Sequence, residues 1–170
     1  TQVAVRSPEH AYQSGDKVGQ QWQSLRYRGA PDFDRACAEH ARLRDILVDN
    51  GAEVVDLSGP ASLTLDAVYT RDATVVTPKG LVLCHMGRAS RQAEPSINAR
   101  LIEEQTGLGV LGQIEPPGLV EGGDVIWLDA TTMAVGRGVR TNDADIDQLR
   151  RMLGASTSVH TVPLPEPRHP

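Results

Sequence analysis

The stretch that decides the fold is DVIWLDATTMAVGRGVRTNDADIDQLRRML, residues 124–153. It opens with two apolar segments, DVIWL (124–128) and MAVGR (133–137), and a short polar linker between them predicts a β-hairpin. The segment 142–153 follows with apolar residues at helical spacing, after an asparagine suited to cap a helix. A further strand is expected at 158–163. The chain is therefore predicted to form a hairpin, a helix and a strand in succession.

The same order of elements is predicted earlier in the chain. AVYTRDATVVTP (67–78) and LVLCHM (81–86) predict a hairpin around the turn at Lys79-Gly80, and a helix at 96–107 and a strand at 109–114 follow. The remaining predictions are strands at 3–8 and 52–57, a helix at 32–51, and a polar loop or lid at 15–31. A repeat of roughly fifty residues is in the range typical of propellers and arrays. The fold class is therefore α/β with an internal repeat.

The two copies of the repeat carry charged residues at matching places. Asp72 and Asp124 stand at the expected start of each hairpin, and the segments GRASR (87–91) and GRGVR (136–140) stand before each helix. Copies packed around a pseudo-symmetry axis would bring these loops together at one end. A pocket lined by acids and arginines suits a ligand with one cationic and one anionic end, because carboxylates hold a cation and arginine forks onto a carboxylate.

Composition and charge exclude several classes of protein. The 170 residues are 39% hydrophobic, which is enough for a packed core, and 17 basic against 22 acidic residues give a net charge of −5. This mild acidity argues against a nucleic-acid partner, and no apolar run is long enough to predict a membrane span. The two cysteines lie far apart in the sequence, so neither a disulfide framework nor a zinc site is expected. A cytoplasmic protein is the expectation.

Four motifs are informative because of their order and spacing along the chain. They are LDAVYTRD (65–72), SRQAE (90–94), VEGGDVIWL (120–128) and VGRGVRTN (135–142). Together they resemble the guanidine-modifying superfamily of dimethylarginine dimethylaminohydrolases, arginine deiminases and amidinotransferases. The resemblance implies an α/β-propeller, or pentein, of five ββαβ units around a central pocket. Residues 1–170 are then expected to form a partial propeller of about three units, with the C-terminal units absent.

The resemblance also implies a chemistry. In this superfamily a cysteine thiolate attacks a guanidinium carbon and a histidine acts as general acid and base. The expected function is a hydrolase that converts arginine or an N-methylated arginine to citrulline plus ammonia or an amine, with no metal and no organic cofactor. Two alternatives stay open. The protein could be an amidinotransferase that passes the amidino group to an acceptor amine, or a binding protein for guanidino amino acids.

Matching the motifs residue by residue assigns roles. Glu121 would be the catalytic carboxylate, and Asp66 and Asp72 would hydrogen-bond the guanidinium nitrogens. Arg91 and Arg140 would bind the amino-acid end of the substrate, chiefly its carboxylate.

Neighbouring residues have supporting or alternative roles. Asp124 would be structural, and pairing with Glu94 is the alternative for Arg91. Gly122 and Gly123 would let the backbone pass close to the substrate.

The family's nucleophile and histidine do not match any residue of this chain. Cys84 stands in an apolar run and Cys37 on a predicted helix, where a thiol is usually a small packing residue. His169 matches the loop just before the family's histidine. The expected partners are therefore a small guanidino substrate and either the remaining C-terminal segment of the same protein or another chain that covers the open propeller edge. A homodimer also stays open.

Overall fold

The computed structural model describes residues 1–165, and His169 lies outside the described residues. The chain divides into two compact units. The first unit comprises Thr1–Thr70 with Arg100–Gly107, and the second comprises Arg71–Ala99 with the residues from Leu108 onward. Each unit has its own architecture, and the two are described in turn.

The first unit is built on a parallel pair of strands. β1 (Gln2–Val5) pairs with β2 (Glu53–Asp56). The segments between and after them form α1 (Pro8–Ala11), α2 (Gly15–Gln21), α3 (Phe33–Asp49) and the 3₁₀ turn η1 (Leu65–Val68). The predicted strands and the long helix are confirmed, and α3 begins after Asp32, whose side chain accepts from the Arg35 amide.

The prediction of a polar loop at 15–31 is wrong for its first part. Residues Gly15–Gln21 form α2, because the Ser14 hydroxyl accepts from the Lys17 amide and caps the helix. Val18 is buried against the apolar cluster around Tyr12 and Leu65. One well-placed cap and one buried side chain therefore outweigh the polar composition of this segment.

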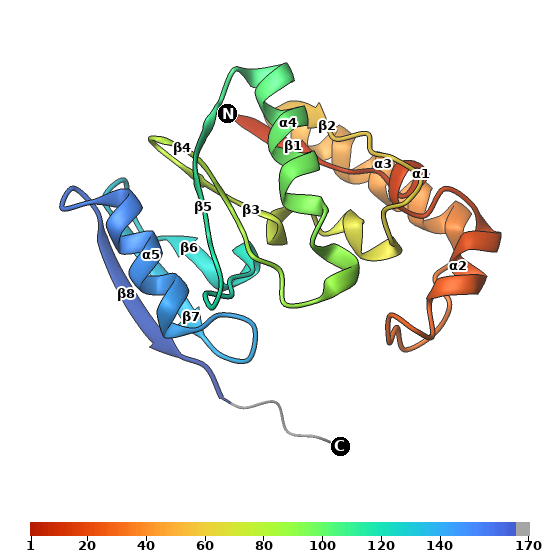
Figure 1. The fold of residues 1–170 in the computed structure, drawn as a ribbon. Helices are drawn as coiled ribbons and strands as arrows, with labels where there is room; N and C mark the ends of the chain where they lie inside the picture. Colours follow the sequence, from red (N-terminus) through yellow and green to blue (C-terminus); the bar gives the residue numbers. More distant parts are fainter. Residues whose placement is uncertain (166–170) are drawn as a thin grey trace. The chain divides into compact units, whose positions relative to one another are not determined.

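The predicted repeat occurs twice from Thr74 onward, and apart from the C-terminal half of α4 both copies belong to the second unit. One copy comprises β3 (Thr74–Thr77), β4 (Gly80–Leu83), α4 (Glu94–Thr106) and β5 (Val110–Gln113); the other comprises β6 (Val125–Trp127), β7 (Thr132–Arg137), α5 (Asp143–Leu153) and β8 (Ser158–Pro163). In each copy the hairpin is antiparallel and the third strand adds in parallel to the second, which makes a mixed three-stranded sheet. Figure 1 shows α5 running alongside β7 and β8. The C-terminal half of α4 belongs to the first unit.

The first predicted hairpin begins later than the sequence pattern indicates. Residues up to Asp72 form the 3₁₀ turns η1 and η2 (Thr70–Asp72), and β3 starts only at Thr74. Asp66 and Asp72 therefore lie in turns and not in a strand.

One apolar core joins the two copies of the repeat. Its buried members are Val75, Val82, Cys84, Met86, Ile114, Val120, Val125, Met133, Val135, Ile146, Leu149 and Leu153. Hydrogen bonds also connect the copies. Among them, Lys79 Nζ donates to the Leu153 carbonyl at 2.5 Å and Trp127 Nε1 donates to the Val76 carbonyl at 2.9 Å. A sheet with one apolar face cannot bury that face alone, so the two copies bury apolar side chains, those of α5 included, in a common core.

Helix α5 begins with a capping box. Asn142 Oδ1 accepts from the Asp145 amide at 3.2 Å, and Asp145 Oδ1 accepts from the Asn142 amide at 2.8 Å. Asn142 also reaches the segment before β6, where its Nδ2 donates to the Pro117 carbonyl and its Oδ1 accepts from the Leu119 amide. The capping box therefore fixes the start of α5 against the segment that leads to Glu121.

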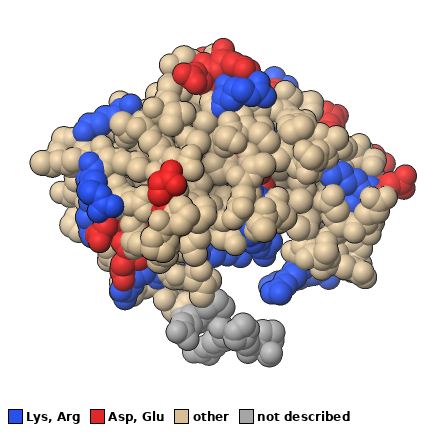
Figure 2. All heavy atoms as spheres, in the orientation of Figure 1, with Lys and Arg blue, Asp and Glu red and all other residues tan. Residues whose placement is uncertain are grey.

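On the face shown in Figure 2, basic and acidic side chains are interspersed. Among residues 1–165, no helix has the length and apolarity that a membrane span requires.

Asp145 is expected to make stability depend on pH. Burial raises the pKa of this carboxyl to about 7, and its Oδ2 has no hydrogen-bond partner. The unfolded pKa is about 3.9, so the folded state holds the proton more tightly. The contribution of Asp145 to the free energy of unfolding should be fully present below about pH 4 and should be lost as pH rises towards 7, with a slope of at most about 1.4 kcal/mol per pH unit.

Urea unfolding between pH 4 and 8 measures this effect. Asp145→Asn should flatten this part of the profile, whereas Asp147→Asn, at an exposed position of the same helix, should keep the wild-type slope. Parallel profiles for the wild type and Asp145→Asn would contradict the prediction.

Candidate functional site

The site centres on a buried carboxylate paired with an arginine. Glu121 stands just before the 3₁₀ turn η4 (Gly122–Asp124), and only 6% of its side chain is exposed. Arg140, in the loop between β7 and α5, donates from Nη1 to Glu121 Oε2 at 2.8 Å. This hydrogen bond raises the pKa of Arg140 against the opposing effect of burial. The pair is therefore a charge-assisted hydrogen bond between a buried acid and a half-exposed base.

Thr141 ties the acid to its surroundings. Its buried hydroxyl accepts from the Glu121 amide at 3.3 Å and donates to Asp124 Oδ2 at 2.7 Å. The Asp124 amide in turn donates to the Glu121 carbonyl at 2.9 Å. Asp124 thus orients the Thr141 hydroxyl, and Thr141 and Asp124 together fix the backbone of Glu121. The sequence analysis gave Thr141 no such role.

A second arginine is fully engaged by acids. Arg91 is 3% exposed; its Nε and Nη2 donate to the two oxygens of Glu94 at 2.9 and 2.8 Å, and its Nη1 donates to Asp72 Oδ2 at 2.8 Å. Burial acts to lower the pKa of Arg91, but the hydrogen bonds that it donates to Glu94 and Asp72, and their negative charges, outweigh burial and raise that pKa. Arg91 therefore holds Asp72 in place, and its predicted contact with a substrate stays a prediction.

The two glycines after Glu121 serve a close approach of backbone to backbone. A Cβ on Gly122 would lie well inside van der Waals contact with the Arg71 carbonyl and 3.0 Å from the Thr74 carbonyl. The Arg71 side chain reinforces this approach, because Nη2 donates to the Val125 carbonyl at 2.6 Å. The expected reason for these glycines is therefore corrected at Gly122: it makes room for the segment before β3 rather than for a ligand.

A cavity of about 370 Å³ opens beside the Glu121–Arg140 pair. It is lined by Asp72, Glu121, Gly123, Asp124, Gly138, Val139, Arg140, Leu164 and Pro165. The second unit thus brings together three of the predicted site residues, Glu121, Asp72 and Arg140. Asp66 is buried in η1 of the first unit, and its role stays a prediction.

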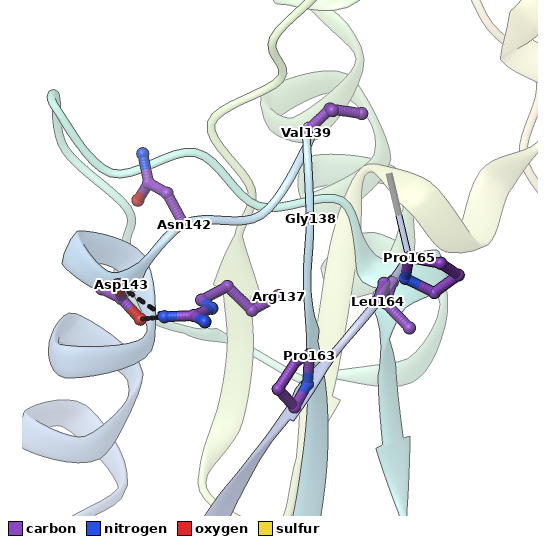
Figure 3. A pocket seen from close by; sticks show the side chains of 8 residues that line it. All are labelled: Arg137, Gly138, Val139, Asn142, Asp143, Pro163, Leu164 and Pro165. Atoms are coloured by element: carbon purple, nitrogen blue, oxygen red, sulfur yellow. Dashed lines mark hydrogen bonds and ion pairs between the residues drawn. The ribbon is translucent and has the colours of Figure 1, made fainter. Parts of the chain in front are cut away.

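A neighbouring hollow of about 400 Å³ shares the wall formed by Gly138, Val139, Leu164 and Pro165. Figure 3 shows its other side, where the Arg137 side chain extends towards Asp143 at the start of α5. Their ion pair measures 3.2 Å, and both side chains are largely exposed. Arg137 is therefore engaged with the surface of α5, whereas Arg140 is engaged with a buried acid.

Both cysteines are poor nucleophiles. Cys84 is 4% exposed, and burial raises the pKa of its thiol although the Gly122 amide acts in the opposite direction. The pKa of Cys37 is also raised, by burial and then by Glu9. The reactive form of cysteine is the thiolate, so neither thiol suits covalent catalysis at neutral pH. Within residues 1–165, no cluster of three or more histidine, cysteine or acidic side chains is arranged to hold a metal ion.

A family model and a curated relative both match this chain. The family model of arginine deiminase matches residues 60–164. A dimethylarginine dimethylaminohydrolase of Streptomyces coelicolor is 36% identical over 102 residues, which is 59% of this chain and 38% of that protein.

Solved structures share the fold. A Pseudomonas aeruginosa dimethylarginine dimethylaminohydrolase, a cysteine-to-serine mutant complexed with citrulline, has a TM-score of 0.77 at 22% identity over 97% of this chain and 61% of its own. The N-terminal domain of a cyanobacterial arginine dihydrolase bound to substrate has a TM-score of 0.75 at 21% identity, over 96% and 58%. The chain therefore spans about 38% of the curated relative's length and about three-fifths of these solved chains.

Replacing Gly122 should damage the fold around the site. Gly122→Ala forces a methyl group against two carbonyl oxygens that belong to backbone and cannot easily move, so we expect a loss of about 1–3 kcal/mol in the free energy of unfolding. Gly87→Ala is the matched control, because nothing lies within 4 Å of the added Cβ. Urea unfolding of the two variants measures the difference, and equal stabilities would contradict the role given to Gly122.

Cys84 should resist thiol reagents in the folded protein. A maleimide at pH 7.5 should label Cys37, which is partly exposed, much faster than Cys84, and the two should approach equal labelling in denaturant. Mass spectrometry of the two peptides measures each site. Rapid labelling of Cys84 in the native state would show that this thiol is accessible, and Cys84 would again be a candidate for the nucleophile.

Proposed function

Because this chain belongs to the arginine deiminase family, we propose that the protein hydrolyses the guanidino group of arginine or of an N-methylated arginine. The products are citrulline and ammonia or an amine. The observation that carries this proposal is the buried carboxylate of Glu121, which lines a cavity and already holds one guanidinium, that of Arg140. A site that binds this group in the free protein has the chemistry to bind it in a substrate.

The charge of the cavity wall supports a cationic ligand. Asp72, Glu121 and Asp124 contribute three carboxylates against the single guanidinium of Arg140. Arg91 is neutralised locally by Glu94, so it positions Asp72 without cancelling the charge of the cavity. A guanidinium entering this space would meet an excess of negative charge that is partly shielded from water, where electrostatic attraction is stronger.

In the proposed reaction Glu121 binds the guanidinium and orients its carbon for attack. Asp72, which Arg91 holds in place, binds another of its nitrogens, and Arg140 binds the substrate carboxylate. We place the nucleophilic cysteine and the histidine in the C-terminal units of the propeller, because Cys84 and Cys37 are unsuited to attack. The same arginine dihydrolase domain has been solved covalently bound to a reaction intermediate, which supports a covalent route.

Hydrolysis is favoured over amidino transfer because these relatives are named as a dimethylarginine dimethylaminohydrolase and an arginine dihydrolase. The deciding experiment incubates the full-length protein with arginine or methylated arginines, with and without an acceptor amine, and measures citrulline. Citrulline formed without an acceptor supports the proposal. Amidino transfer without citrulline would identify a transferase, and binding without either product would identify a binding protein.

Glu121→Gln in the full-length protein should lower kcat by about 10²–10³-fold, because the neutral amide no longer holds the guanidinium cation with its carbon oriented for attack. Thermal unfolding checks that the variant is folded. Glu115→Gln, at an exposed position in the segment leading to the site, should leave kcat unchanged. A Glu121→Gln enzyme with nearly wild-type kcat would remove this residue from the mechanism.

A further inference from the structure

The two members of the central ion pair differ greatly in exposure. The side chain of Glu121 is 6% exposed, whereas that of Arg140 is 51% exposed. Arg140 is also attached to the protein in a way that leaves its side chain room to move. Its neighbour Thr141 is anchored by Asp124, while Gly138 and Val139 on its other side are exposed. Arg140 could therefore turn away without disturbing the Thr141 anchor.

This difference makes separation of the pair costly for one member only. Arg140 would regain water if it left Glu121, and an exposed guanidinium is well solvated. Glu121 would be left as a buried carboxylate without a cation, which is strongly unfavourable. The acid therefore requires a cation, and Arg140 supplies one when no ligand is present.

We infer that Arg140 is a specificity-determining residue that occupies the guanidinium site of Glu121 until a ligand bearing its own guanidinium takes its place. This inference rests on the proposed function, since it concerns the same site. The ligand's guanidinium replaces that of Arg140 on Glu121, and the released Arg140 pairs with the ligand's carboxylate. No covalent bond is made or broken, and the one ion pair of the free protein is replaced by two in the complex.

The exchange selects between ligand classes. A ligand with a carboxylate but no cationic group at its side-chain end would draw Arg140 away and leave Glu121 unpaired, so it should bind weakly. Citrulline is such a ligand, because its ureido group is uncharged and its one cationic group, the α-ammonium, lies beside the carboxylate. Once a guanidinium has been converted to a ureido group, Arg140 returns to Glu121 and favours release of the product. The same residue would thus govern both substrate entry and product exit.

A ligand without a carboxylate tests the inference directly. Methylguanidinium can replace Arg140 on Glu121 but cannot use the released arginine, so the wild-type protein must give up its own ion pair to bind it. In Arg140→Ala the Glu121 carboxylate has no internal cation, and we expect methylguanidinium to bind at least about tenfold more tightly. Isothermal titration calorimetry on the full-length protein measures the two dissociation constants.

Three further variants test whether the tighter binding comes from the loss of the cation next to Glu121. Arg140→Lys keeps a cation within reach of Glu121 and should bind methylguanidinium about as weakly as the wild type. Arg137→Ala removes an arginine of the same region that pairs with Asp143 on the surface, and should change nothing. Adding Glu121→Gln to Arg140→Ala should abolish the gain. Thermal unfolding establishes that each protein is folded.

An unchanged or weaker affinity of Arg140→Ala for methylguanidinium would overturn the inference, as would the absence of binding to every variant. The inference and the proposed function fail in different ways. Citrulline production with no gain in Arg140→Ala would sink only the inference. A gain in Arg140→Ala without citrulline production would leave the inference standing and reject the hydrolase.

Discussion

A buried carboxylate needs a cation, and much of the second unit is organised around meeting that need at Glu121. The acid is 6% exposed and its partner Arg140 lies 2.8 Å away. Three features fix this geometry. The Thr141 hydroxyl holds the Glu121 amide, the capping box of α5 ties Asn142 to the segment before Glu121, and Gly122 lets this segment lie against the carbonyls that precede β3. Helix capping and backbone packing thereby determine where the acid stands.

The internal repeat gives this arrangement twice, with different outcomes. In each copy the last arginine of a G-R-x-x-R segment meets an acid that stands shortly before the hairpin: Arg91 meets Asp72, and Arg140 meets Glu121. The first arginine is buried and held by Glu94 as well, so its side chain is fixed. The second is half-exposed and pairs with Glu121. Duplication of one motif has therefore produced a permanent ion pair and an exchangeable one.

Much of the fold could be predicted from the sequence because hydrophobic periodicity is strong in the second unit. The hairpins, α4, α5 and the parallel third strands follow from alternating and helical patterns with clear caps such as Asn142. Helix α2 was missed because it buries only Val18 of seven residues and its composition is polar. The turns before β3 were assigned to a strand because their apolar residues resemble one.

The site could be predicted only as far as residue types and motif spacing allow. Glu121, Asp72 and Arg140 were expected to converge, and the cavity brings them together. The pairing of Arg140 with Glu121 was not expected, because it depends on how two loops nineteen residues apart approach each other. The contact of Gly122 with the segment around Arg71 joins positions fifty-one residues apart, and no local pattern encodes it. The roles of Asp66 and of the C-terminal cysteine and histidine stay predictions.

The central claim is that a bound ligand's guanidinium replaces that of Arg140 at the Glu121 carboxylate. A crystal structure of the full-length protein, with the proposed nucleophilic cysteine replaced by serine and arginine bound, would show this directly. We predict that a guanidinium nitrogen of the ligand lies within hydrogen-bond distance of Glu121 and that Arg140 has turned to the ligand's carboxylate. A ligand bound elsewhere, with Arg140 still paired to Glu121, would contradict the central claim.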